Sequence, residues 1–399
     1  MKIEVISLKQ QLEVYNTMQA LFKNLKGDKV IWAVVLFLGI LSILAVYSSI
    51  VSLAYKYQDG NTEYFLFKHG FILIVGFGLM FAAHKLNYKY YSRISQIAIF
   101  IAAPLLLFTL LTGASINDAS RWLVIPVINQ TFQTSDLAKL ALIMFLARIL
   151  SKKQDVIKDF GSAFLPIMFP IVVICGLILP ANFSTAAMLF TTSIVIMFIG
   201  RINLKYIISM AAVGIVFVSL FIAIVINTNY TGRVETWKNR IENFTSGDSQ
   251  NNYQAEQSKI AIATGGPLGK GPGGSTQRNF LPHPYSDFIY AIVIEEYGIV
   301  GGFILLLLYL ILLYRGIMIS LKAPRTFGAL LAVGLSFSLV FQAMINMAVA
   351  VNLFPVTGQP LPMVSMGGTS IWFTCLAVGI ILSVSRSVYE EDKEEVAHG

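Results

Sequence analysis

The stretch VIWAVVLFLGILSILAVYSSIVSLA, residues 30–54, contains no charged residue. A run of this length can cross the hydrocarbon core of a bilayer as an α-helix, which takes roughly 20 residues. It is too long for the apolar part of a cleavable signal peptide, and the polar residues 1–29 precede it. The sequence therefore predicts a membrane-spanning helix near the start of the chain.

Comparable apolar runs recur along the whole chain. Of its 399 residues, 56% are hydrophobic and only 13% are charged, whereas soluble domains carry about a quarter charged residues. We therefore expect one all-α integral membrane domain instead of several soluble domains. About ten transmembrane helices are predicted, near residues 30–54, 64–83, 96–112, 136–150, 161–180, 183–200, 206–227, 288–313, 327–351 and 370–386.

The lysine and arginine residues of the short loops predict the orientation of these helices. Such residues collect on cytoplasmic loops. Here they lie on one side of the predicted bundle, at Lys85, Lys89, Arg93, Lys152, Lys153, Lys158, Arg201, Lys205, Arg315, Lys322 and Arg325. Segments 55–63 and 353–369, on the other side, contain only Lys56. Both termini are therefore predicted to be cytoplasmic, and the long loop at about 228–286, between helices seven and eight, to be extracytoplasmic.

This topology divides the chain into three regions. Residues 1–29 carry apolar residues at helical spacing and predict an amphipathic segment lying on the cytoplasmic face, or a helix docked elsewhere. Residues 30–387 form the membrane domain. Residues 388–399 are predicted to be an acidic cytoplasmic tail.

The net charge of +8 is explained by basic loops facing anionic membrane lipid, so we expect no nucleic-acid partner. Both cysteines, Cys175 and Cys375, lie in apolar runs and predict no disulfide framework. The four histidines and two cysteines have no clustered spacing. A protein-bound zinc site is therefore not expected.

The long loop has two features of its own. Val234, Trp237, Ile241 and Phe244 form an apolar stripe typical of a helix on the outer membrane surface. Residues 264–275, TGGPLGKGPGGS, are glycine-rich, but their spacing does not match a nucleotide-binding P-loop. We expect a tight turn in which the backbone approaches a neighbouring segment or a ligand closely.

Ionisable residues at or near membrane depth are candidates for chemistry, because they are costly there. Asp136 and Lys139 are three residues apart on one face of the fourth predicted helix. They are either part of a functional site or a structural ion pair. Asp287 stands at the start of the eighth, as either a functional carboxylate or a helix cap.

The extracytoplasmic side is also basic, at Arg121, Arg233, Lys238, Arg240, Lys259, Lys270 and Arg278. These cations depart from the charge pattern of the short loops. They favour an anionic ligand such as a phosphate, with anionic lipid headgroups as the alternative.

Several segments together resemble the SEDS family (shape, elongation, division and sporulation) of membrane glycosyltransferases. The similar stretches are NDASRW at 117–122, QTSDLAK at 133–139, QAEQS at 254–258 with the glycine-rich turn, SDFI at 286–289, EEYG at 295–298, Asn346, PVTG at 355–358 and SMGGTS at 365–370. Ten helices with both ends inside also fit this family. The stretch 352–362 and the polar N-terminus look more like the division member than the elongation member.

Three positions depart from the family pattern. Asn182 stands where the family has an acidic residue, Asp136 where it has glutamate, and Met366 where it has tyrosine. The resemblance therefore assigns no detailed role to Asn182 or Asp136.

The resemblance implies polymerisation of lipid II into glycan strands on the outer face of the cytoplasmic membrane. A sugar hydroxyl attacks the anomeric carbon of the undecaprenyl-linked glycan, and undecaprenyl diphosphate leaves. The resemblance makes Asp287 the general base. It implies that the substrate and its diphosphate are held by Arg121, Lys139, Gln133, Arg233, Arg240, Lys270 and Ser365. A divalent cation, Mg²⁺ or Mn²⁺, would suit the diphosphate.

The implied partners are a class B penicillin-binding protein, which acts as the transpeptidase, and divisome proteins. The implied location is the cytoplasmic (inner) membrane at the division septum. A lipid II flippase or other lipid transporter is an alternative that would use the same cations but would not need Asp287 as a base. A non-catalytic scaffold is a second alternative, and an elongation-type polymerase a third.

Overall fold

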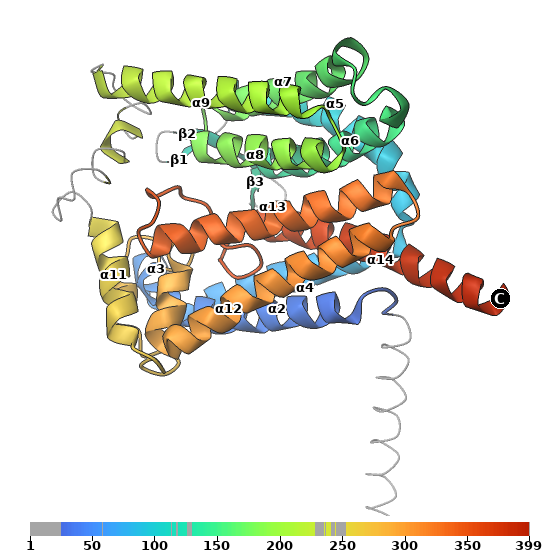
Figure 1. Cartoon of the computed structure of the whole chain (residues 1–399). Coiled ribbons are helices and arrows are strands. Elements are labelled where there is room, and N and C mark those ends of the chain that lie inside the picture. Colours follow the sequence, from blue (N-terminus) through green and yellow to red (C-terminus); the bar gives the residue numbers. More distant parts are fainter. Residues whose placement is uncertain are drawn as a thin grey trace, which may run out of the picture.

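The computed structural model describes residues 25–57, 59–112, 114–116, 119–125, 130–227, 235, 237–240, 244 and 253–398. Most of these residues form long helices that run alongside one another (Figure 1). A small sheet and a helical loop region lie together at one end of the bundle. The amphipathic segment predicted within residues 1–29 lies outside the described residues as far as residue 24.

The helices follow the order of the apolar runs. They are α2 (Lys29–Ser49), α3 (Val51–Tyr57), α4 (Thr62–Lys85), α5 (Tyr88–Thr112), α6 (Thr134–Lys152), α7 (Leu165–Ile178) after a π-helical turn at Phe160–Phe164, α8 (Phe183–Ile199), α9 (Leu204–Asn227), α11 (Tyr253–Gly265), α12 (Ile289–Lys322), α13 (Thr326–Ala350) and α14 (Thr369–His398).

Length and composition confirm a helical membrane protein. Among the described residues, 8 helices are long and apolar enough to cross a bilayer, and the helix Phe183–Ile199 is apolar but shorter. The predicted fourth span corresponds to α6, whose 19 residues include Asp136, Lys139, Arg148 and Lys152. These charges lower its hydropathy, so the count of ten spans stays a prediction.

The first predicted span, residues 30–54, is wrong as one continuous helix. α2 ends at Ser49, and α3 begins at Val51. The Ser49 hydroxyl donates to the backbone oxygens of Ala45 and Val46 at 2.8 and 3.2 Å. Such bonds compete with the helical pattern and can bend helices, and these two lie directly before the break, at a point where hydropathy stays high.

The region between α5 and α6 contains a three-stranded antiparallel sheet that the hydropathy pattern did not predict. Its strands are β1 (Ala114–Ile116), β2 (Ala119–Ile125) and β3 (Gln130–Gln133), in the order β1-β2-β3. Trp122 of β2 pairs with Gln133 of β3. This pairing fixes the chain directly before α6 and so sets where that helix begins.

The helices differ in how much of their surface is covered. α13 and α14 occupy the middle of the bundle (Figure 1), and α14 packs against α4 while α13 packs against α12 and α6. In the most apolar part of α14, 72% of the residues are buried, compared with 11% in α9. α9 therefore presents most of its apolar surface outward, as a lipid-facing helix does.

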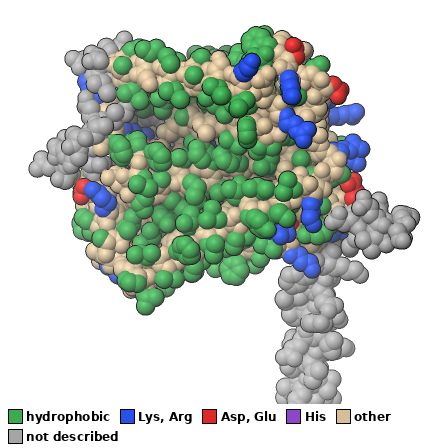
Figure 2. All heavy atoms as spheres, in the orientation of Figure 1, with side chains coloured by type: hydrophobic (Ala, Val, Ile, Leu, Met, Phe, Trp, Pro, Cys, Tyr) green, Lys and Arg blue, Asp and Glu red, His purple; other side chains and the backbone are tan. Residues whose placement is uncertain are grey.

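On the face that Figure 2 shows, lysine and arginine side chains gather at the end of the bundle from which α14 projects. The broad middle of the face is hydrophobic. The basic end carries the loops that the sequence assigns to the cytoplasm. The opposite end, where the sheet and α11 lie, is therefore the end that the prediction places outside.

The glycine-rich stretch makes the close backbone approach expected of it. Gly269 has a φ of +81°, and a Cβ built there would lie 2.2 Å from the backbone oxygen of Glu296. Gly298 has a φ of +71° inside α12, and the amide of the next residue, Ile299, donates to Gly266 O at 3.0 Å. The loop is thus joined to a break in α12, and neither glycine can carry a side chain without strain.

Candidate active site

Asp287 lies in the turn directly before α12, at the end of the bundle that carries the sheet and α11. The N-cap of α12 is Phe288, and no side chain caps the helix there. The carboxylate of Asp287 is therefore not used as a helix cap, which removes the structural alternative for this residue. Its Oδ1 accepts a hydrogen bond from the Ser286 hydroxyl at 2.9 Å, and the side chain is half-buried.

Burial raises the pKa of the Asp287 carboxyl above its ordinary value of 3.8. The hydrogen bond from Ser286 and the charges of His283 and Arg240 act in the opposite direction but do not cancel this effect. A carboxylate whose pKa is moved toward the working pH is a better proton acceptor. The local environment therefore suits a general base.

Arg240 is the cation that the structure places in the electrostatic environment of Asp287. Burial lowers the pKa of the Arg240 guanidinium, and the charge of Asp287 raises it. Residues 237–240 are helical, and Trp237 packs against Phe183 of α8 and Phe221 of α9. These aromatic contacts hold the predicted surface helix over the ends of two membrane helices; Val234 and Ile241 of its stripe lie outside the described residues.

The segment between α13 and α14 packs beside this turn. Ser365 is 1% exposed; its hydroxyl donates to the backbone oxygen of Ser286 at 2.6 Å and accepts from the Leu361 amide at 2.8 Å. Gly358 also lies near, since a Cβ built on it would be 3.6 Å from Asp287 Oδ2. Ser365 therefore holds the backbone that surrounds Asp287, and its role as a ligand for substrate stays a prediction.

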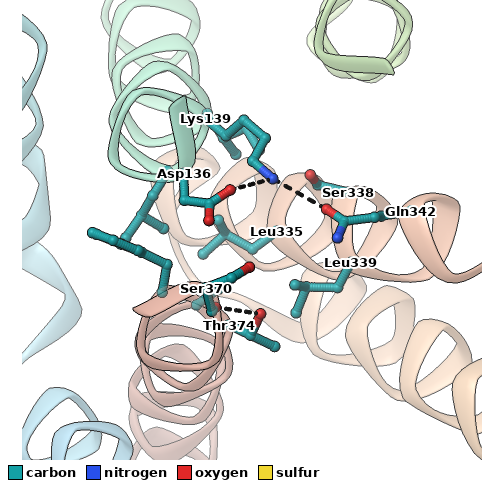
Figure 3. A pocket seen from close by; sticks show the side chains of 12 residues that line it. Asp136, Lys139, Leu335, Ser338, Leu339, Gln342, Ser370 and Thr374 are labelled. Carbon is teal, nitrogen blue, oxygen red and sulfur yellow. Dashed lines mark hydrogen bonds and ion pairs between the residues drawn. The ribbon is translucent and has the colours of Figure 1, made fainter. Parts of the chain in front are cut away.

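Asp136 and Lys139 line a small pocket, open to the outside, between α6, α13 and α14 (Figure 3). Lys139 Nζ lies 2.8 Å from Asp136 Oδ1 and donates to Gln342 Oε1 at 3.1 Å. Asp136 Oδ2 is buried and has no hydrogen-bond partner among the described residues. The pocket thus offers a cation and a carboxylate oxygen, so a ligand with both an anionic group and a hydrogen-bond donor would suit it.

Gln133 stands at the junction of β3 and α6, and its side-chain amide donates to Ser135 at 2.8 Å. It is thus held within the first turn of the helix that carries Asp136. Arg121 belongs to β2, but its side chain lies outside the described residues, as does the whole of Arg233. The predicted roles of Gln133, Arg121 and Arg233 at the diphosphate stay predictions.

Lys270 takes part in a buried ionic cluster that sequence reasoning missed. Its ammonium lies 2.6 Å from Oε1 of Glu295, which is 0% exposed. The same carboxylate accepts from Ser275, from the amide and hydroxyl of Thr276, and from the Gln277 amide. The cluster holds the glycine-rich loop on α12. In the sequence, the two adjacent glutamates Glu295 and Glu296 inside an apolar run could have indicated this cluster.

No group of three or more His, Cys, Asp or Glu side chains among the described residues is placed to hold a metal ion. The buried carboxylate of Asp136 forms an ion pair with Lys139, and the half-buried carboxylate of Asp287 is influenced by the charge of Arg240. The fold and these groups define a class: a polytopic helical membrane protein with a candidate acid–base residue at one end and a pocket suited to an anionic, hydrogen-bonding ligand.

Comparisons with known proteins give the family. The model of the FtsW, RodA and SpoVE family, described as cell cycle proteins, matches residues 28–390. This chain belongs to that family, as the resemblance to SEDS proteins predicted. It is 34% identical over 365 residues to a Geobacter sulfurreducens (strain DL-1 / KN400) protein named probable peptidoglycan glycosyltransferase FtsW, covering 90% of this chain and 95% of the relative.

A second relative is stage V sporulation protein E of Bacillus subtilis (strain 168), which is 34% identical over 377 residues, 91% of this chain and 98% of the relative. Among solved structures, a chain of a peptidoglycan synthase complex that coordinates polymerization and crosslinking matches with a TM-score of 0.72 and 25% identity, over 91% of this chain and 98% of that one. RodA of Thermus thermophilus has the same fold, with a TM-score of 0.65 at 23% identity over the same shares.

Proposed function

We propose that this protein is a peptidoglycan glycosyltransferase of the FtsW type, which joins lipid II into glycan strands during cell division. The observation that carries the proposal is Asp287: a half-buried carboxylate with a raised pKa that is not used as a helix cap and that is influenced by the charge of Arg240. The relatives named peptidoglycan glycosyltransferase support the same reaction, and so does the structural match to a peptidoglycan synthase complex.

In the proposed reaction Asp287 accepts the proton of an acceptor sugar hydroxyl. The hydroxyl oxygen forms a bond to the anomeric carbon of the growing glycan. The bond from that carbon to the diphosphate oxygen breaks, and undecaprenyl diphosphate leaves with the electron pair. A single displacement of this kind inverts the configuration at the anomeric carbon.

Cations stabilise the departing diphosphate in this proposal. Lys139 is the cation that lines the pocket, and Arg240 is the one whose charge acts on Asp287. Arg121, Arg233 and Lys270 are further candidates from the sequence. A Mg²⁺ or Mn²⁺ ion would be held by the diphosphate oxygens, since the described residues provide no cluster of carboxylates for it.

We further propose that the chain works in the cytoplasmic membrane at the division septum, with a class B penicillin-binding protein and divisome proteins as partners. The relatives named FtsW favour the division role over an elongation role. The matching synthase complex couples polymerization to crosslinking, which supports a transpeptidase as the partner.

Detergent solution separates a polymerase from a lipid II flippase. A micelle has no second side, so a transporter leaves lipid II chemically unchanged there, whereas a polymerase forms glycan. We expect the purified protein, with its penicillin-binding partner blocked at the transpeptidase site, to convert fluorescent lipid II into strands resolved on a gel. Unchanged lipid II, together with lipid II transfer across vesicle membranes containing the same protein, would favour the flippase.

A further inference from the structure

Two amide side chains on one face of α13 connect the pocket at Lys139 to the turn that carries Asp287. Gln342 and Asn346 are four residues apart, so they lie one above the other on the helix. Each donates to the backbone of the segment that follows α13: Gln342 to Pro360 O at 2.9 Å, and Asn346 to Gln359 O at 2.7 Å. Two successive carbonyls are therefore held by two successive turns of α13.

Asn346 also holds the candidate base. Its amide nitrogen donates a second bond, at 2.9 Å, to the backbone oxygen of Asp287. The residue is 1% exposed. Both hydrogens of the amide are therefore used to join residues 287 and 359, and a change at Asn346 must move one relative to the other. Gly358, the residue before Gln359, lies against the Asp287 carboxylate.

The side-chain oxygen of Gln342, Oε1, faces the Lys139 pocket. This oxygen accepts from Lys139 Nζ at 3.1 Å, while Nε2 holds Pro360 (Figure 3). The ammonium of Lys139 therefore contacts Asp136 and Gln342 at once. An ammonium has three hydrogens, and these two contacts use two of them. An anion that binds the third hydrogen attracts the ammonium away from Gln342 and Asp136 and so alters both contacts.

We propose that Gln342 and Asn346 are positioning residues that transmit occupancy of the Lys139 pocket by a diphosphate to the backbone of Asp287. This inference rests on the proposed function, because it takes the diphosphate as the ligand and Asp287 as the base. It assigns the two amides no contact with the reacting atoms. Their effect is to couple the position of the Asp287 backbone to the contacts that Lys139 makes.

Hydrogen exchange tests the coupling without requiring any reaction. Undecaprenyl diphosphate is the probe, added to the full-length protein in detergent. We expect it to slow amide exchange in residues 283–290 of the native chain. In Gln342→Met the ligand still binds, but this slowing is lost. Equal slowing in both proteins, or none in the native chain, would overturn the proposal.

Kinetics test the same coupling in a second way. Because a displacement of about 1 Å can cost a hundredfold in rate, we expect Gln342→Met and Asn346→Leu each to lower kcat about tenfold or more with little change in KM. Since both act through one path, the double variant should be hardly worse than the poorer single variant. Additive losses would contradict the proposal.

Ser336→Ala is the matched control, since Ser336 is buried on α13 and its hydroxyl has no hydrogen-bond partner among the described residues. It should leave kcat, exchange and thermal stability unchanged. If undecaprenyl diphosphate slows amide exchange in the native chain but the native chain makes no glycan, the proposed polymerase activity is refuted and the coupling stands. If the native chain makes glycan but undecaprenyl diphosphate still slows amide exchange in Gln342→Met, only the coupling is refuted.

Discussion

At the scale of single residues, burial and charge act in opposite directions on Asp287. Burial raises the pKa of this carboxyl, while Ser286, His283 and Arg240 hold the rise in check. The base form is therefore present above the raised pKa and is lost as pH falls through it. The same shift favours the native state at low pH, and that stabilisation is lost as pH rises through the raised pKa.

Arg240→Gln tests the electrostatic part of this account. Removing the guanidinium removes a charge that lowers the pKa of Asp287. We expect the acidic limb of the pH–kcat profile to move to higher pH, and kcat at neutral pH to fall. Lys259→Gln is the control: it removes a charge from an exposed ion pair with Glu256 on α11. An acidic limb unmoved by Arg240→Gln would show that this pair does not tune the base.

At the scale of elements, the glycine-rich loop and α12 form one structural unit. Glu295 accepts hydrogen bonds from the loop between residues 270 and 277, and Glu296 accepts from Ser48 of α2 and from the Ser275 amide. Arg278 donates to the backbone oxygen of Ser48 at 3.2 Å. The loop thus fastens the outer ends of α2 and α12 together, close to the break between α2 and α3.

Glu295→Gln keeps the size of the side chain and removes its charge. Because a buried acceptor then loses its charge-assisted bonds, we expect a loss of roughly 1–3 kcal/mol in stability. Thermal unfolding in detergent measures it. Glu256→Gln, on the exposed pair with Lys259, should change stability by less than about 0.5 kcal/mol. Equal effects of the two substitutions would contradict the role of the cluster.

Gly298→Ala tests the junction between the loop and α12. Its φ of +71° is unfavourable for alanine, and the added Cβ would lie 2.1 Å from Pro267 O. With a ψ of −176°, this is a backbone region that is essentially restricted to glycine, and the strain alone costs about 1–3 kcal/mol. Gly78→Ala is the control, since Gly78 is exposed on α4 with nothing within 4 Å of a built Cβ. A Gly298→Ala protein as stable as the Gly78→Ala protein would refute the close approach.

At the scale of the whole molecule, the predicted orientation puts the Asp287 end outside the cytoplasm, where lipid II polymerisation would occur. Leu268→Cys places a thiol on the glycine-rich loop, and Lys322→Cys places one at the far end of α12. In intact cells a membrane-impermeant thiol reagent should label only the first. The native Cys175 and Cys375 are buried, so they add little background. The opposite labelling pattern would invert the topology.

Hydropathy and residue spacing were enough to predict the class of fold, the Asp136–Lys139 pair and the close glycine turn. The role of Asp287 as a base came from the family resemblance and stays a prediction. They did not predict the contacts that join distant elements, such as Ser48 with Glu296 or Lys139 with Gln342, since no local pattern marks a partner more than 200 residues away. The small sheet was missed because two of its three strands, β1 and β3, have only 3 and 4 residues.

The most direct test compares the native chain with Asp287→Asn in the polymerisation of purified lipid II, with the partner's transpeptidase site blocked. The amide has nearly the shape of the carboxylate but cannot accept the proton. General-base catalysis contributes about 10²–10⁴-fold, so we expect long strands from the native chain and at least a hundredfold slower synthesis from the variant. Equal synthesis by both proteins would contradict the account.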